Sequence, residues 1–167
     1  MNKQTQAKEL EQLHEASYAW ALRCCYEDQE AAEEVLQNTY LKILEGKAKF
    51  REHSSFKTWL FSVIRFTAID HLRARKRRKN ITLNQFYGDL SEEKIEENEQ
   101  LSSNTFRTLL KQLSSKQQQV LHLVFYQNCT IEEAAKIMEI QLGTARTHYE
   151  RGKKQLRKKL LKYEASR

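Results

Sequence analysis

The stretch of residues 50–79, FREHSSFKTWLFSVIRFTAIDHLRARKRRK, constrains the fold of this chain more than any other segment. Its apolar side chains recur three or four residues apart, which is the spacing of one face of a helix. Ser54 or Ser55 stands where an N-cap is expected. The sequence therefore predicts a long helix with a buried face made of Phe56, Trp59, Leu60, Val63, Ile64, Thr67, Ala68 and Leu72.

The composition favours helices throughout the chain. No proline and only four glycines occur among the 167 residues, and no segment alternates apolar and polar residues as a half-buried strand does. We therefore expect an all-α fold made of two small helical domains, the second of which is a helix-turn-helix. The expected boundaries are residues 1–79 for the first domain, 80–104 for a flexible acidic linker and 105–167 for the second domain.

Two more helices are predicted in the first domain. One covers residues 7–26, and the other begins after Asp28, a candidate N-cap, and ends at Gly46. On chemistry alone, the polar side of this second helix is an ordinary solvated surface. Residues 47–55 follow it without a clear period and predict a loop.

In the second domain, local signals place the helix-turn-helix. Ser114 with Gln117 and Thr130 with Glu133 fit the capping-box pattern of a helix start. A turn at residues 139–141 and a long helix from Leu142 complete the motif. The outward side of that last helix is predicted to contain Thr144, Arg146, Thr147, Glu150 and Arg151, and a basic tail that includes Lys154 follows them.

The charge indicates a polyanionic partner. The formal net charge is +7 at pH 7 and the pI is about 9.3. The helix within residues 50–79 is expected to carry a basic, partly aromatic outer face formed by Lys57, Phe61, Arg65, Ile69 and Arg73. Cations bind phosphates and exposed aromatic rings stack on unpaired bases, so this face favours nucleic acid.

A basic surface also suits an anionic membrane, but no run of about 18 apolar residues could span one. The N-terminal residues lack the apolar centre of a signal peptide, and we expect a cytoplasmic location. Three cysteines, Cys24, Cys25 and Cys129, have no zinc-type spacing. Buried thiols are expected, with a redox sensor as the alternative. We expect no catalytic residue, metal, cofactor or small-molecule substrate, because no phosphate loop or nucleophile arrangement occurs.

Several ordered strings in the sequence resemble one protein family. Phe50-Arg51, Ser54-Ser55-Phe56, Thr58-Trp59-Leu60 and Ala68-Ile69-Asp70-His71-Leu72-Arg73 with the basic run look like the promoter-melting and promoter-recognition segment of bacterial RNA polymerase sigma factors, in the extracytoplasmic-function group. AEEVLQNTYLKIL, residues 32–44, is similar to the family segment that docks on the clamp helices of the polymerase β′ subunit. Residues 113–160 resemble the reader of the upstream promoter element.

The resemblance implies a sigma factor that binds core RNA polymerase through its β′ clamp and β subunits, recognises and melts promoter DNA, and has an anti-sigma factor as a partner. The implied polymerase contacts are Glu34, Gln37, Leu41 and Lys42. The candidate contacts to melted promoter DNA are Arg51, His53, Ser54, Ser55, Lys57, Phe61, Arg65, Arg73, Arg75, Lys76 and Arg77. The candidate contacts to the upstream element are Thr144, Arg146, Thr147, Glu150, Arg151 and Lys154.

The sequence departs from the family pattern at Asn38, where an acidic residue is usual, and at Glu139, where the turn usually has glycine. Gln141 replaces a serine cap and His148 replaces an arginine. The alternative function is a stand-alone helix-turn-helix regulator of transcription. That alternative gives no role to residues 32–44 or to the basic run after Leu72.

Overall fold

The computed structural model describes residues 1–85 and 103–167, apart from the side chains of residues 81–85 and 103–104. Within these ranges the chain forms α-helices, one π-helical turn and no strand, which confirms the all-α expectation. The predicted acidic linker lies largely outside the described residues. The elements are α1 (Lys3–Gln12), α2 (His14–Cys24), α3 (Gln29–Leu44), α4 (Phe56–Gln85), α5 (Ser103–Lys111), α6 (Ser115–Leu121), η1 (His122–Tyr126), α7 (Ile131–Met138) and α8 (Leu142–Ala165).

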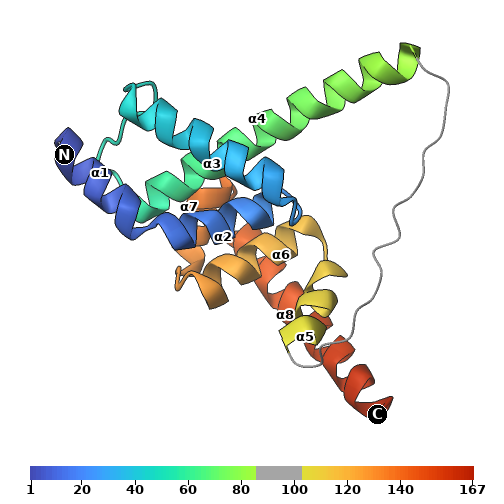
Figure 1. Ribbon diagram of the computed structural model, residues 1–167. Coiled ribbons are helices and arrows are strands. Elements are labelled where there is room, and N and C mark those ends of the chain that lie inside the picture. The colour runs from blue at the N-terminus through green and yellow to red at the C-terminus, as the bar shows by residue number, and fades with distance from the viewer. Residues whose placement is uncertain (86–102) are drawn as a thin grey trace.

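The first module consists of α1 to α4, and α2 and α3 pack against the N-terminal half of α4 (Figure 1). Trp20, Val35, Leu60 and Ile64 are fully buried where these helices meet. The C-terminal half of α4 continues past the other helices and projects from the body of the molecule (Figure 1). Because α4 extends to Gln85, residues 80–85 of the predicted linker are helical.

Local sequence signals set the ends of these helices, and one predicted helix needs correction. The helix predicted over residues 7–26 is two helices, because Leu13 leaves the helical conformation (φ −94°, ψ 6°). Asp28 caps α3 as predicted, since its carboxylate accepts a hydrogen bond of 3.1 Å from the Ala31 amide. Gly46 follows the end of α3 with φ +74°, a conformation that costs glycine little.

The face of α4 that packs inward is wider than predicted. Ser55 is its N-cap, since the Ser55 hydroxyl accepts a hydrogen bond of 3.1 Å from the Thr58 amide. The prediction that Phe61 lies on the exposed face is wrong: the side chain is fully buried, and its ring stacks on Trp20 with centroids 6.1 Å apart. Trp59, Val63 and Leu72, which were predicted to be buried, are only partly so. Phe61 is buried because a second set of helices covers the other side of α4.

The second module contains α5 to α8, and its helix starts follow the predicted signals. Both capping boxes, at Ser114 with Gln117 and at Thr130 with Glu133, are formed. Glu139 adopts a left-handed conformation (φ 52°, ψ 44°) between α7 and α8, and α8 begins at Leu142 as predicted. The helix-turn-helix formed by α7 and α8 is therefore confirmed.

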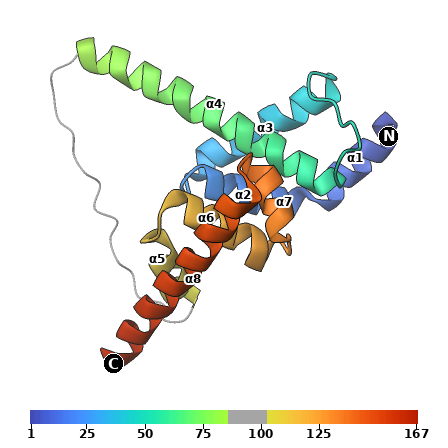
Figure 2. The same ribbon diagram turned by 180° about the vertical axis from the view of Figure 1, so that it is seen from behind.

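The two modules pack against each other, with α7 against α4 and α6 against α2 (Figure 2). Trp20 lies at the centre of this junction, because its ring stacks on Phe61 and also on His122 of η1, at 5.7 Å between centroids. Polar contacts surround it: the Arg23 guanidinium donates to the Gln118 side chain (2.7 Å) and also pairs with Glu27 (3.0 Å). Burial and the nearby Arg23 charge lower the pKa of His122 to about 3, so His122 is neutral in this junction.

Replacing Trp20 with phenylalanine tests the importance of this junction. Trp20→Phe removes the hydrogen bond of 3.0 Å from the indole Nε1 to the Phe61 carbonyl and leaves unfilled space in the core. We expect the free energy of unfolding to fall by about 2–3 kcal/mol, from the lost hydrogen bond and the cavity together. Urea unfolding monitored by circular dichroism measures this free energy. Trp59→Phe is the matched control, because Trp59 is only half-buried. Equal losses in both variants would contradict a central role for Trp20.

Candidate polymerase-binding and DNA-binding surfaces

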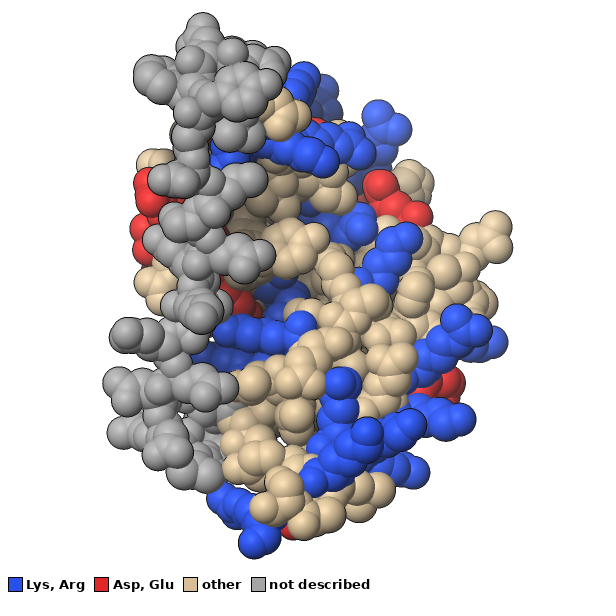
Figure 3. All heavy atoms as spheres, turned by 90° about the vertical axis from the view of Figure 1, so that its right-hand side faces the viewer, with Lys and Arg blue, Asp and Glu red and all other residues tan. Residues whose placement is uncertain are grey.

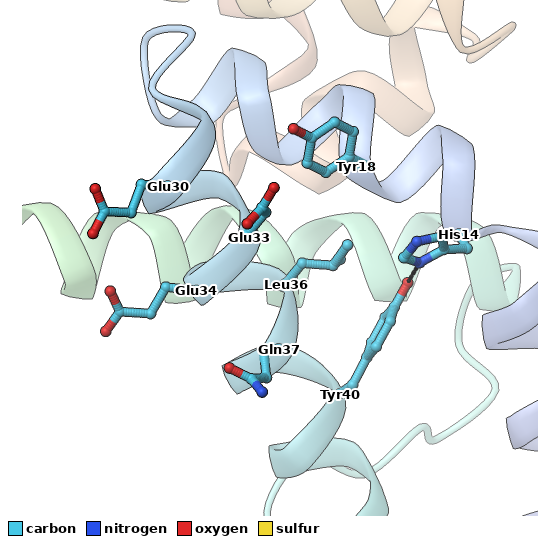
Figure 4. Close-up of a pocket in the computed structure, with 8 residues that line it drawn as sticks. All are labelled: His14, Tyr18, Glu30, Glu33, Glu34, Leu36, Gln37 and Tyr40. Carbon is cyan, nitrogen blue, oxygen red and sulfur yellow. Dashed lines mark hydrogen bonds between the residues drawn. The ribbon is translucent and has the colours of Figure 1, made fainter.

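An open pocket of about 770 Å³ lies between α2 and α3 (Figure 4). The hydrogen-bonded pair of His14 and Tyr40, 3.1 Å apart between Nδ1 and the hydroxyl, closes one end of it. Three carboxylates of α3, those of Glu30, Glu33 and Glu34, line the other end. This pocket is therefore an acidic groove on a chain whose net charge is +7.

The predicted polymerase contacts divide between two places. Glu34 and Gln37 line the acidic groove, and Leu41 lies one turn further along the same side of α3 with 49% of its surface exposed. Lys42 points elsewhere, because its ammonium group donates a hydrogen bond of 3.3 Å to the Thr67 hydroxyl of α4. The structure thus brings three of the four predicted residues onto one surface.

Sequence reasoning missed the α2 wall of the groove. His14 and Tyr18 are four residues apart and therefore share one side of that helix, facing Glu33 and Tyr40 of α3 (Figure 4). Their spacing was visible in the sequence, but nothing in it indicated which side of α2 meets α3. Burial raises the pKa of the Tyr40 hydroxyl, so Tyr40 stays a neutral hydrogen-bonding group there.

The loop before α4 presents polar side chains above an aromatic base. Arg51, His53 and Ser55 are exposed and Ser54 is partly buried. The Ser55 hydroxyl is engaged as the cap of α4 and also donates to the Thr58 hydroxyl at 2.9 Å. The rings of Phe50, Phe56 and Trp59 pack together with centroids 5.3–5.4 Å apart and anchor the loop.

Two cations that were predicted to face DNA instead contact the second module. The Lys57 ammonium donates to the Gln127 carbonyl, and Arg65 Nε donates to the Gln119 side chain at 2.9 Å. Phe61, between them on α4, is buried and cannot stack on a base in this arrangement. These three residues therefore lie at the junction of the modules and not on an open surface.

The cations at the projecting end of α4 are on the surface. Arg73, Arg75, Lys76 and Arg77 are all exposed, and Arg75 pairs with Asp28, the cap of α3, at 2.6 Å. Figure 3 shows a face of the molecule on which Lys and Arg side chains outnumber Asp and Glu, at the level of this end of α4 and again lower down at the level of α8. A surface with this charge suits a phosphate backbone.

The outward side of α8 has the character predicted for a recognition helix. Ala145, Gly152 and Leu156 are buried and hold α8 against the rest of the second module. Arg146 and Glu150 make only exposed ion pairs, with Glu132 (3.7 Å) and Lys153 (3.5 Å), which are weak and easily exchanged. All the predicted contacts to the upstream element are exposed: Thr144, Arg146, Thr147, Glu150, Arg151 and Lys154.

The three cysteines are buried free thiols, as expected. Burial raises the pKa of Cys24 and raises that of Cys25 to about 11, so neither is a thiolate at neutral pH. Among residues 1–85 and 103–167, no group of three or more His, Cys, Asp or Glu side chains could hold a metal ion. None of the helices in that part of the chain has the length and hydropathy needed to cross a membrane.

Known proteins match both modules. The Sigma-70 region 2 family model matches residues 10–78, and the Sigma-70 region 4 model matches residues 103–156. The chain is 32% identical over 139 residues to RNA polymerase sigma factor YlaC of Bacillus subtilis (strain 168), covering 80% of this chain and 79% of that protein. It is 31% identical over 140 residues to ECF RNA polymerase sigma factor SigX of the same strain, covering 78% and 71%.

The fold as a whole is similar to that of sigma factor RpoE from Bartonella quintana, solved in complex with the anti-sigma factor NepR. The TM-score is 0.73 at 23% identity, over 93% of this chain and 96% of that one. The fold is therefore that of a two-module helical protein, and the sequence matches place the chain among proteins of transcription. The chain belongs to the sigma-70 family of RNA polymerase sigma factors, in its extracytoplasmic-function group, and directs transcription initiation. A stand-alone regulator would leave the match to region 2 unexplained.

The pairing of Arg75 with Asp28 gives a prediction about pH. The hydrogen bond from Arg75 lowers the pKa of the Asp28 carboxyl, so the pair stabilises the fold above the ordinary pKa of aspartate, and this stabilisation is lost as the pH falls through the lowered value. In Arg75→Ala we expect the Asp28 pKa, measured by NMR titration, to rise toward its ordinary value. The loss of stability at pH 7 should stay below about 1 kcal/mol because the pair is exposed. Arg77→Ala is the matched control, and an unchanged Asp28 titration in Arg75→Ala would contradict the pairing.

Proposed function

We propose that the two modules divide the work of this sigma factor. The first module, residues 1–79, binds core polymerase and melted promoter DNA, residues 80–104 link the modules, and residues 105–167 read the upstream element. One observation carries this proposal: the acidic groove with the neighbouring Leu41, and the outward side of α8, are separate exposed surfaces on different modules. One chain can therefore engage the polymerase and duplex DNA at once.

The acidic groove is the proposed docking site for the clamp helices of the β′ subunit. Its carboxylates favour a basic partner surface, and Leu41 offers an exposed apolar anchor beside them. Glu34, Gln37 and Leu41 are the proposed contacts. Lys42 is bonded to Thr67 across the helix pair, so we assign it a supporting position at the edge of this surface.

DNA is proposed to contact two regions. In the first module the loop residues Arg51 and His53 and the exposed cations of α4 would hold the melted strand. In the second module α8 would enter the major groove, where Arg146 can donate two hydrogen bonds to guanine and Glu150 can accept from cytosine. Arg151 and Lys154, further along α8, would contact phosphates.

The partners follow from the same reasoning. The structure of the similar RpoE includes the anti-sigma factor NepR, and we propose that an anti-sigma factor also controls this chain. Sigma factors are in general not enzymes, and we propose that this one catalyses no reaction itself. It would act in the cytoplasm, together with the polymerase and the chromosome.

Run-off transcription with purified core polymerase tests the proposal. We expect the full chain to co-elute with sigma-free polymerase and to give promoter-dependent transcripts. Leu41→Ala should weaken co-elution about tenfold, the effect of losing one buried apolar anchor. Leu161→Ala is the matched control, because Leu161 is a similarly exposed leucine on α8. Equal co-elution of both variants would contradict docking on α3.

Substituting Arg146 tests the reading of DNA by α8. Arg146→Ala should cost about 1–3 kcal/mol of binding to the preferred upstream element and relax the choice at one base pair. Lys154→Ala should instead weaken binding to all sequences and reduce the salt dependence. Competition binding to a set of single-base variants of the DNA measures both. A uniform loss in Arg146→Ala would assign Arg146 to a phosphate and not to a base.

A further inference from the structure

A second pocket, of about 190 Å³, lies between α3 and α4 next to the acidic groove. Two carboxylates, those of Glu30 and Glu34, line both this pocket and the groove. Their side chains extend in the same direction from α3 (Figure 4). The α4 wall of the second pocket is formed by His71, Arg75 and Arg78. Glu30 and Glu34 therefore lie between the surface proposed to dock polymerase and a row of basic side chains on α4.

We propose that His71 positions the Glu34 carboxylate for polymerase docking, so that protonation of His71 weakens the binding of core polymerase. The inference rests on the proposed function, in which Glu34 contacts a basic surface of the polymerase. It assigns a role to a residue of α4 that none of the predicted polymerase or DNA contacts includes, and it makes docking dependent on pH.

The contact between these two side chains joins an enclosed group to an exposed one. Nδ1 of His71 lies 3.9 Å from Oε1 of Glu34. The His71 side chain is 17% exposed, whereas the Glu34 side chain is 55% exposed. The imidazole is thus held by its surroundings, while the carboxylate keeps the rotational freedom of a long surface side chain. At this distance the two groups form an ion pair only when the imidazole carries a proton.

The other charged groups around His71 keep their charge near neutral pH. Arg75 and Arg78, one and two turns further along α4, are guanidinium groups, which stay protonated in proteins. Arg75 pairs with Asp28 at 2.6 Å, and this contact lowers the pKa of the Asp28 carboxyl. From α3, Glu30 also faces the pocket. Histidine is the side-chain type whose charge ordinarily changes between about pH 5 and pH 8, and His71 is the histidine of this pocket.

Protonation of His71 changes what the groove offers to a partner. A cationic imidazole attracts the Glu34 carboxylate toward α4 and offsets part of its charge, so a basic partner meets a weaker negative field. A neutral imidazole leaves the carboxylate free to turn toward the partner. Docking is therefore tighter at alkaline pH and weaker at acid pH. Because Glu34 lies at the surface, salt screens the effect, and its size is that of one exposed ion pair.

Titration of the fluorescently labelled full chain with sigma-free core polymerase, followed by anisotropy at low salt, tests this inference. The dissociation constant is measured at about pH 5.5 and about pH 8, and the ratio of the two values gives the pH dependence. His71→Gln keeps a polar side chain and removes the titrating charge. We expect its ratio to be about threefold smaller than the wild-type ratio. His148→Gln, which should keep the wild-type ratio, is the matched control, because His148 is a partly buried histidine of the other module.

The ratio isolates the contribution of His71. Each chain is compared with itself, so a loss of affinity common to both pH values does not alter the ratio. His14, at the other end of the groove, and the titrating groups of the polymerase are the same in wild type and in His71→Gln. Their contributions therefore cancel when the two ratios are compared.

A Glu34→Gln background identifies the partner of His71. In that background, the further change His71→Gln should leave the ratio unchanged, because no carboxylate remains at that position for the imidazole to attract. A shift that persists in the Glu34→Gln background would overturn the positioning of Glu34 by His71. An equal shift in His148→Gln would overturn it too, since it would indicate a general charge effect.

Two further outcomes separate this inference from the proposed function. If wild type binds core polymerase and His71→Gln has the wild-type ratio, the role of His71 is wrong and the proposed function stands. If wild type does not bind core polymerase at either pH, the proposed function is wrong, and the role of His71 is wrong with it.

Discussion

The packing of Trp20 determines how the rest of this molecule is arranged. Its indole stacks on Phe61 and on His122, and its Nε1 donates to the Phe61 carbonyl at 3.0 Å. One side chain of α2 thus holds α4 of the first module and η1 of the second. Large aromatic groups in fully buried positions contribute strongly to stability. The packing of the two modules against each other therefore depends on the contacts of Trp20, which are apolar at the centre of the junction and polar at its edge.

The polar edge of this junction uses cations that DNA would also attract. Lys57 and Arg65 donate to groups of the second module, and Arg23 donates to Gln118. These contacts hold the three cations at the junction of the modules. In the packed arrangement, Phe66 and the cations Arg73, Lys76 and Arg77 of α4 are exposed, while Phe61 is buried in the core.

The sequence predicted what depends on neighbouring residues and missed what depends on distant ones. The caps at Asp28, Ser114 and Thr130 formed as expected, because the two partners of each cap are three residues apart. The burial of Phe61 was missed, because the helix periodicity shows one apolar face and cannot indicate that another module covers the second. For the same reason the acidic groove was not predicted: the polar side of α3 has a local pattern, but the groove also needs its α2 side, which depends on how the two helices pack.

Several residues in the left-handed conformation lie near the junction of the modules, whereas Gly46 and Glu52 adopt it in the loop region before α4. Tyr26 and Glu27 (φ 55° and 65°) reverse the chain after α2, and this reversal lets the Glu27 carboxylate pair with Arg23, which bonds to Gln118. Asn128 (φ 53°) follows Gln127, whose carbonyl accepts from Lys57, and Glu139 (φ 52°) lines an open pocket together with Lys42 and Phe66 of the first module. Such conformations cost residues other than glycine some stability, and they persist where surrounding contacts offset that cost. Near Tyr26 and Glu27 part of that compensation lies between the modules, because the Ser115 hydroxyl donates to the Tyr26 hydroxyl at 3.5 Å and Arg23 donates to Gln118. Separating the modules would therefore remove these contacts and leave this turn under greater strain.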